Sequence, residues 1–206
     1  MIKLFNILKI IICMDGTCNM NREKMISRLK SKINEKRFEH SLGVEYTAAC
    51  MAMVHGVDIE KARIAGLLHD CAKCLPTKEK LEKARKHKLA VSKFEEKNPD
   101  MLHGKLGAYY AKSRYEVDDV EILDAITYHT TGRPNMTLLD KIIFVADYIE
   151  PNRKELKDMD IIRKEAFEDI DKCVIHILKN TLDYLNNSTN EMDFMTQLTY
   201  NYYVNN

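Results

Sequence analysis

Apolar residues recur at helical spacing along most of the chain. The longest such pattern covers Ile161–Leu185, with apolar side chains at positions 162, 166, 170, 173, 174, 177, 178, 182 and 185, as on one buried helix face. Similar patterns predict helices over about Arg22–Ile33, Lys36–His55 and Leu102–Arg114. No window alternates between apolar and polar residues as a half-buried strand does. The pattern therefore predicts an all-α protein.

Start and stop signals bound several of these helices. Gly56 follows the second helix, at a position where a left-handed cap costs little. Asp58 is the expected N-cap of a third helix that runs to about Lys73, and Thr77 is the expected cap of the charged helix after it. Two further helices, ending near His129 and before Pro151, begin with capping-box spacings: Asp118 with Glu121, and Thr137 with Asp140.

The composition fits one compact domain with a sizeable core. The chain has 206 residues, 45% of them hydrophobic, and a formal net charge of +1 from 32 basic and 31 acidic residues. This balance gives no basic footprint for nucleic acid or for an anionic membrane. Six scattered cysteines do not suggest a disulfide framework, so a cytoplasmic location is expected. A homodimer stays possible.

The chain divides into three parts. Residues 1–20 are expected to be an extension outside the domain; their apolar run is too short to span a bilayer and lacks a small-residue cleavage site. Translation that starts at Met14 or Met20 is one hypothesis for this extension. Residues 21–186 carry the helical patterns and form the expected domain. Residues 187–206 are expected to be a polar tail or a short helix.

Four histidines and one aspartate lie on the apolar faces of five predicted helices. Positions three, four and seven residues apart share a helix face. His69 follows Ala62, Ala65 and Gly66, a stripe of small residues that predicts close helix packing. The other members of the set are His40, His103, His129 and Asp147, and Asp70 stands beside His69.

Two interpretations of this set are open on the residues alone. A single histidine on an apolar face is more often a hydrogen-bonded core residue than a ligand. A carboxylate such as Asp147, on a stripe with Ile143 and Phe144, is costly to bury unless a cation compensates it. Histidines and carboxylates from facing helices form metal sites in bundle cores. This mixture of ligands suits Fe, Mn, Co or Zn rather than Mg or Ca.

The remaining histidines and the cysteines lack such a setting. His55, His87 and His176 have no small-residue stripe with a nearby carboxylate, so they are left out of the site. Cys71 and Cys74 have the spacing of a redox or zinc motif. They lie at the C-terminal end of a predicted helix, where the dipole disfavours a thiolate. The thiols are therefore expected to take no part in the chemistry.

The order His40, then His69-Asp70, then Asp147 resembles the H…HD…D signature of HD-domain metal-dependent phosphohydrolases. The HD dipeptide alone is a weak signal, whereas the full order, with each member on a helix, is fairly specific. Longer stretches make the chain similar to the bacterial symmetrical bis(5'-nucleosyl)-tetraphosphatases, over about Asn21–Leu185. They are RFEHSLGV (37–44), GLLHDCAK (66–73), LHGKLGA (102–108), AITYHTTGRPNM (125–136) and LDKIIFVADYIEPNR (139–153).

The resemblance implies a single compact HD-domain helical bundle that holds one or two metal ions. His40, His69, Asp70 and Asp147 would hold one ion. His103 and His129 would face a second ion or the substrate phosphates, with Asp70 as a bridge. The implied ion is iron, with Mn, Co or Zn as alternatives. The implied reaction is the hydrolysis of diadenosine tetraphosphate to two ADP by metal-activated hydroxide.

Polar side chains near these motifs are candidates for contact with the substrate. The expected catalytic residues are Asp70, Lys73 and His103. The expected substrate contacts are Arg37, His103, His129, Thr130, Thr131, Arg133 and Arg153. Lys73 could instead be an ordinary helix-end lysine, and at least one of the four cations is expected to be exposed at the surface. Asp140 would either orient a ligand or serve only in its capping box.

Other functions stay open on the sequence. HD proteins also cleave nucleoside monophosphates, cyclic dinucleotides or guanosine alarmones, and the residues fix the metal ligands better than the substrate. The alternative of another class is a helical nucleotide-binding regulatory module with a degenerate site. Every expected ligand is present in the chain, so the small-molecule hydrolase is the favoured interpretation.

Overall fold

The computed structural model describes residues 20–154, 156–187 and 193–206, so the predicted extension lies almost entirely outside the described part. The regular elements in these ranges are all helices, and the all-α prediction is confirmed. They are α2 (Arg22–Lys30), α3 (Glu35–His55), α4 (Ile59–Leu68), α5 (Thr77–Lys86), α6 (Lys93–Lys97), η1 (Pro99–Leu102), α7 (His103–Tyr115), α8 (Val120–Tyr128), α9 (Leu138–Ile149), α10 (Met159–Glu168), α11 (Ile170–Asn186) and α12 (Phe194–Asn205). Across those ranges, no helix has the length and apolar character needed to cross a bilayer.

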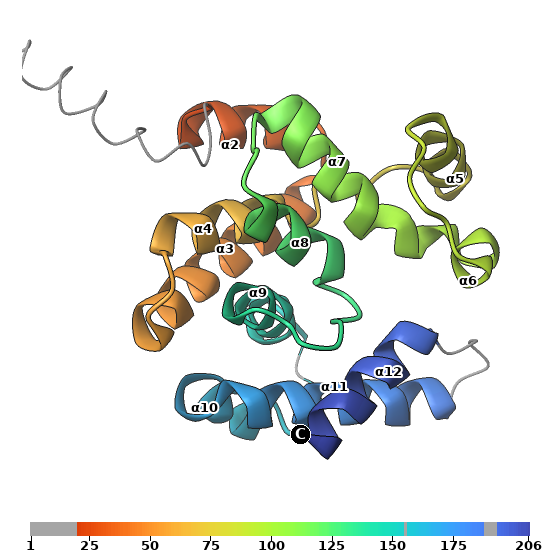
Figure 1. The fold of residues 1–206 in the computed structure, drawn as a ribbon. Coiled ribbons are helices and arrows are strands. Elements are labelled where there is room, and N and C mark those ends of the chain that lie inside the picture. Colours follow the sequence, from red (N-terminus) through yellow and green to blue (C-terminus); the bar gives the residue numbers. More distant parts are fainter. Residues whose placement is uncertain (1–19, 155, 188–192) are drawn as a thin grey trace, which may run out of the picture.

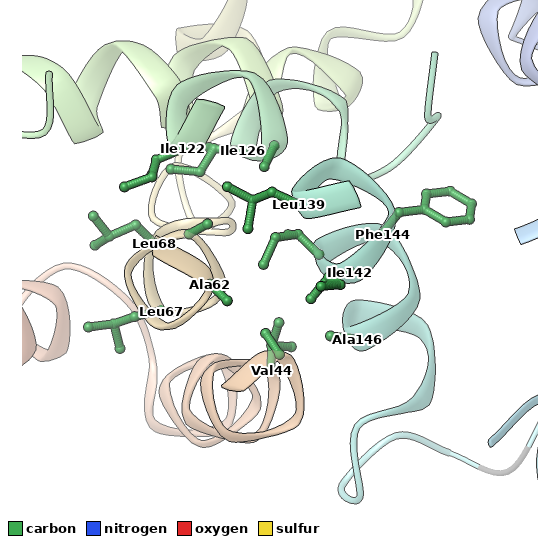
Figure 2. Close-up of a cluster of buried hydrophobic side chains, with 14 of the residues drawn as sticks. Val44, Ala62, Leu67, Leu68, Ile122, Ile126, Leu139, Ile142, Phe144 and Ala146 are labelled. Atoms are coloured by element: carbon green, nitrogen blue, oxygen red, sulfur yellow. The ribbon is translucent and has the colours of Figure 1, made fainter. Parts of the chain in front are cut away.

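The core lies where α3, α4, α8 and α9 meet (Figure 2). Val44 of α3, Leu68 of α4, Ile126 of α8 and Ile142 of α9 are all fully buried. Helix α7 packs against α8, and α10, α11 and α12 form a further layer beside α9 (Figure 1). Helices α5 and α6 lie at the edge, next to η1 and the start of α7. Helices α3, α4, α8 and α9, which carry or precede five of the six candidate ligands, therefore surround this core, and α7, which begins at His103, packs against α8.

Several predicted helix ends are confirmed. Gly56 ends α3 in the left-handed conformation, at φ 73°. The side chain of Asp58 caps α4 by accepting a hydrogen bond from the Lys61 amide. Thr137 and Asp140 form the predicted capping box at the start of α9. Local hydrogen bonds of this kind satisfy the first free amides of a helix, which is why sequence reveals them.

Two predicted caps are wrong. Helix α5 begins after Pro76 without a side-chain cap, and the Thr77 hydroxyl donates instead to Asp100. Helix α8 is capped by Asp119, whose carboxylate accepts from two backbone amides, and not by its neighbour Asp118. In both cases the tertiary contact decides, since Asp119 also pairs with Lys61 at 2.9 Å.

Two predicted helix lengths are also wrong. The third helix ends at Leu68 with His69 as its C-cap, and a series of turns replaces its expected last turn to Lys73. The long pattern over 161–185 is broken at Asp169, where the backbone is extended and the side chain caps α11. Apolar residues keep their spacing across this break, because Ala166 and Ile170 both face the core.

Candidate metal centre

The six predicted metal ligands meet at one point between five helices. His40 lies on α3, His69 and Asp70 follow α4, His103 begins α7, His129 follows α8, and Asp147 lies near the end of α9. The four histidines and Asp70 are each at most 7% exposed, and the Asp147 side chain is 16% exposed. Residues far apart in the sequence thus form one polar cluster inside an apolar core.

Each imidazole ring is held by its Nδ1 atom. The Nδ1 atoms of His69, His103 and His129 lie 2.7, 2.6 and 2.8 Å from the carbonyl oxygens three residues earlier. The Nδ1 atom of His40 lies 3.0 Å from the Glu150 carboxylate. Carbonyl and carboxylate oxygens only accept, so the proton of each neutral ring lies on Nδ1 and Nε2 keeps its lone pair.

The four Nε2 atoms point at one another in two pairs. Those of His40 and His69 lie 3.2 Å apart, and those of His103 and His129 lie 3.1 Å apart. Two lone pairs at this distance repel rather than bond. Within the described ranges, Oδ1 of Asp70 and Oδ1 of Asp147 are also buried without a hydrogen-bond partner. Bound metal ions would give these atoms partners, and a buried carboxylate is costly unless a cation compensates it.

Two groups of three ligands are spaced to hold a metal ion, with their ligand atoms within 4.8 Å of one another. These groups are His40, His69 and Asp147, and His69, Asp70 and His129. Asp70 faces both sides of the cluster. Its Oδ2 atom lies 3.8 and 3.5 Å from Nε2 of His40 and His69, and its Oδ1 atom lies 3.5 and 3.6 Å from Nε2 of His103 and His129. This is the placement that a bridging carboxylate needs.

Burial and charge shift the titration of the carboxylates. Burial alone would raise the pKa of Asp70, but His69 and His129 hold that pKa well below its usual value. Burial is likewise outweighed at Asp147, whose Oδ1 atom lies 3.0 Å from Nε2 of His40. His40, His69 and Arg153 together keep its pKa low. Both carboxylates are therefore ionised at neutral pH, which is the state that binds metal ions.

The pKa values of two of the histidines shift in opposite directions. Burial, together with His129 and Lys73, lowers the pKa of His103 to about 3, so this ring is neutral at pH 7. Burial would also lower the pKa of His40, but the carboxylates of Asp147 and Glu150 raise it overall. A proton on His40 therefore competes with a metal ion as the pH falls.

Three cations and one hydroxyl border the cluster. Arg37 donates to Oδ2 of Asp70 at 2.6 Å, and Arg153 lies 3.3 Å from Asp147. The Nζ atom of Lys73 lies 3.2 Å from Nε2 of His103. The Thr130 hydroxyl lies 3.1 Å from Nε2 of both His103 and His129. These four predicted residues are thus brought to the cluster.

A cleft of about 520 Å³ opens beside His40. Its lining includes the cations Lys36, Arg37, Arg153 and Lys154, and the carboxylates of Glu39 and Glu150. Positive charge therefore predominates along its walls. A cleft of this volume is in the range of small-molecule sites, and its charge favours an anionic ligand.

Close helix contacts bring the ligands together. A Cβ atom on Gly66 would lie 3.0 Å from the Glu45 backbone on α3, which confirms that the small-residue stripe packs closely. A Cβ atom on Gly104 would lie 2.5 Å from the Thr127 carbonyl oxygen. Only glycine fits there, and this contact sets α7 against α8 so that His103 and His129 meet.

The comparisons with known proteins agree with this site. A family model described as "HD domain" matches residues 37–152. The chain is 41% identical over 185 residues to a Bacillus subtilis (strain 168) protein named "Bis(5'-nucleosyl)-tetraphosphatase, symmetrical", which covers 90% of this chain and 98% of that protein. The chain belongs to the HD-domain family. Within it, the chain belongs to the family of symmetrical bis(5'-nucleosyl)-tetraphosphatases, which are hydrolases.

Two further matches to this HD domain have similar extent. A Halalkalibacterium halodurans protein with the same name is 38% identical over 182 residues, covering 88% of this chain and 96% of that one. A solved structure is described as a predicted HD superfamily hydrolase involved in NAD metabolism from Clostridium acetobutylicum. It matches with a TM-score of 0.88 and 41% identity, over 91% of this chain and 99% of that one. HD domains bind divalent metal ions, and this one has histidine and aspartate groups that could bind them.

Two of the predicted substrate contacts, Arg133 and Thr131, form their hydrogen bonds with residues outside the histidine–aspartate cluster. The Arg133 guanidinium donates to Asp140 at 3.0 and 2.8 Å and pairs with Asp124 at 3.0 Å. The Thr131 hydroxyl donates to the Gly132 carbonyl. The Asp140 carboxylate thus accepts from the Thr137 amide in the capping box and pairs with Arg133. Among the described residues, no bond joins it to a candidate metal ligand.

Sequence reasoning missed Glu150, which holds His40. This residue is 1% exposed and stands three positions after Asp147, immediately before Pro151. The sequence shows an acidic residue beside the Asp147 motif. It does not indicate that this residue contacts a histidine 110 positions away.

The residues left out of the site do lie elsewhere. His176 pairs with Glu165 at 2.8 Å, and His55 donates to the Ala166 carbonyl at 2.8 Å. His87 stacks on Tyr109. Cys71 is a free, buried thiol whose pKa is raised to about 12 by its burial and by Asp70. A thiol of that pKa is inert near neutral pH.

Proposed function

We propose that this HD domain cleaves diadenosine tetraphosphate symmetrically to two ADP, in a metal-dependent hydrolysis. The observation that supports the metal centre most directly is the convergence of four Nε2 lone pairs on the unpartnered oxygens of Asp70 and Asp147. The substrate rests on relatives at 41% and 38% identity that are named for this activity. The substrate class, a dinucleoside polyphosphate, follows from the same names.

Two ligand groups would hold the metal, which we propose to be iron. His40, His69 and Asp147 form one group, and Asp70 links it to His103 and His129. Nitrogen and oxygen donors in this mixture fit Fe, Mn, Co or Zn. A bound divalent ion supplies hydroxide near neutral pH and neutralises charge on phosphoryl oxygens.

The cationic cleft would bind the phosphate chain. Lys36, Arg37, Arg153 and Lys154 line it beside His40, so a tetraphosphate there has several positive charges around it. Arginine fits phosphate oxygens with two parallel N–H donors, and Arg37 and Arg153 lie closest to the carboxylates of the cluster. These two side chains would orient the phosphate that is attacked.

Lys73 is the proposed proton donor to the leaving group. Burial lowers the pKa of its ammonium group, with the charge of Arg37 acting in the same direction and Asp70 in the opposite one. An ammonium with a lowered pKa releases a proton more readily near neutral pH. The Thr130 hydroxyl, beside His103 and His129, would donate to a phosphoryl oxygen. His103, which is neutral, would act as a ligand and not as a cation.

Products distinguish this reaction from its alternatives. Breaking the central P–O–P bond of diadenosine tetraphosphate releases two ADP, whereas breaking an adjacent bridge releases ATP and AMP. The test is product analysis with the metal-loaded protein, next to a panel of nucleoside monophosphates, cyclic dinucleotides and guanosine alarmones. ADP as the sole nucleotide product supports the proposal. ATP with AMP, or turnover only of another class, would contradict it.

The metal dependence has its own test. Protein purified without chelators is expected to contain a transition metal, and His69→Ala should lose both the metal and the activity. His176→Ala is the matched control, because it removes an ion-paired histidine outside the cluster. Metal-free protein that retains its activity after His69→Ala would refute the mechanism. A cytoplasmic location and a homodimer stay predictions of the sequence.

A further inference from the structure

The bond between Glu150 and His40 differs from the other ring contacts of the cluster. His69 and His129 stand at the C-terminal ends of their helices, and His103 follows η1. At such ends each ring can donate to the carbonyl three residues back; the Asp100 carbonyl accepts both the ring and the backbone amide of His103. His40 lies inside α3, the 21-residue helix, where the carbonyls are already paired. Its ring uses a side chain, the Glu150 carboxylate, as acceptor instead.

Glu150 is built into the fold to provide that acceptor. Its Oε1 atom lies 3.0 Å from Nδ1 of His40, and its Oε2 atom accepts a hydrogen bond from the Asn152 amide at 2.6 Å. The residue is 1% exposed. Gly43, one helical turn after His40, leaves the space that the carboxylate fills: a Cβ atom there would lie 2.4 Å from Oε2 of Glu150.

We propose that Glu150 is a positioning residue that fixes the orientation and donor strength of His40, and with them the metal affinity on the His40–His69–Asp147 side. A carboxylate on the far nitrogen of a histidine orients the ring and makes it a stronger ligand. The Nδ1 atoms of the other three rings contact neutral backbone carbonyls instead. The two sides of the cluster are therefore unequal, and the side with Glu150 binds metal more tightly.

The inference rests on the proposed metal centre, and its test separates the two. Mn²⁺ is titrated into chelator-treated protein and followed by calorimetry and by electron paramagnetic resonance. Glu150→Gln keeps the size of the side chain but removes its charge, and it is expected to weaken the tightest Mn²⁺ site about 10- to 100-fold. Wild-type protein that binds no Mn²⁺ and no other transition metal would overturn both the metal centre and this inference. Tight binding that is the same in the wild type and in Glu150→Gln would overturn the inference alone.

A matched control exists in the same chain. Glu165 is also a largely buried carboxylate on the Nδ1 atom of a histidine, His176, at 2.8 Å. Glu165→Gln makes the same chemical change outside the cluster and is expected to leave Mn²⁺ affinity unchanged. Equal weakening in both variants would show a general loss of structure and would overturn the role of Glu150.

Gly43→Ala separates geometry from charge. The added methyl group would meet the flexible end of Glu150, so the carboxylate moves from His40 while its charge stays and the helix gains a residue with higher propensity. Mn²⁺ affinity should fall although the protein still folds. Both changes disturb the same bond, that between His40 and Glu150. The double variant Gly43→Ala/Glu150→Gln should therefore lose little more Mn²⁺ affinity than either single variant. Fully additive losses would contradict a shared mechanism.

Discussion

Gly104→Ala should separate α7 from α8 and thereby the two histidines that these helices carry. The added Cβ atom would lie 2.5 Å from the Thr127 carbonyl oxygen and 3.3 Å from that of Ile126. Ordinary contact begins near 3.4 Å, so the helices must move by about 0.9 Å. The Ile126 carbonyl also holds the His129 ring, and His103 is the neighbour of Gly104. The methyl group therefore acts on both rings.

The expected size of the effect follows from this shift. Overpacking against backbone costs about 1–3 kcal/mol, and the higher helix propensity of alanine returns up to about 1 kcal/mol. The net loss is therefore up to about 3 kcal/mol, which lowers Tm by up to about 12 °C in a domain of this size. A misplacement of about 1 Å at reacting groups can reduce the rate about 100-fold.

The assay compares thermal unfolding with kcat/KM on diadenosine tetraphosphate. Gly107→Ala is the control on the same helix, because its Cβ atom would have its closest contacts at 3.2 Å, with the His69 carbonyl and the Ile126 side chain. Gly107→Ala needs a smaller shift and should lose much less activity. Wild-type kcat/KM in Gly104→Ala, or the larger loss in Gly107→Ala, would refute the reasoning.

Three further predictions concern the ion, the proton donor and acid stability. Chelation should lower Tm together with activity, because an ion at 100 times its Kd adds about 2.7 kcal/mol to stability; a melting curve that chelation leaves unchanged would count against the metal centre. Lys73→Gln should reduce kcat about 100- to 10,000-fold while metal content stays at the wild-type level, and a change confined to KM would assign Lys73 to binding instead. Burial works to raise the pKa of Asp119, but its bond to Lys61 and two backbone amides hold that pKa below its usual value. Its contribution to stability is therefore present above about pH 4 and lost as the pH falls further. When the pH is lowered from 5 to 3, the free energy of urea unfolding should therefore fall less in Asp119→Asn than in the wild type. An equal fall in both proteins would disprove the assignment.

The candidate ligands could be found from sequence because helical periodicity is local. His40, His69, His103, His129 and Asp147 each share a face with apolar residues, and burial of that face turns the polar member inward. Caps such as Asp58 and the Thr137–Asp140 box are also local, since acceptor and amide are three residues apart. Patterns of this range do not depend on the rest of the fold.

Contacts between distant segments could not be predicted in this way. The break at Asp169 is hidden because apolar spacing continues across it. Arg133 is close in sequence to the motif residue His129, yet its guanidinium forms ion pairs with Asp140 and Asp124. A charged side chain is long enough for several partners, and only the packed structure selects among them.

By itself, the sequence determined an all-α chain, the residues that face its interior and the chemistry that such residues can support. The tertiary structure alone decided that Asp70 turns one oxygen to each pair of histidines, and that Glu150 reaches across 110 residues to His40. The reason is physical. The helix face on which a residue lies follows from the spacing of apolar residues over a few positions of the sequence. The distance between two side chains depends on how whole helices pack, and here contacts such as that of Gly104 with α8 set it.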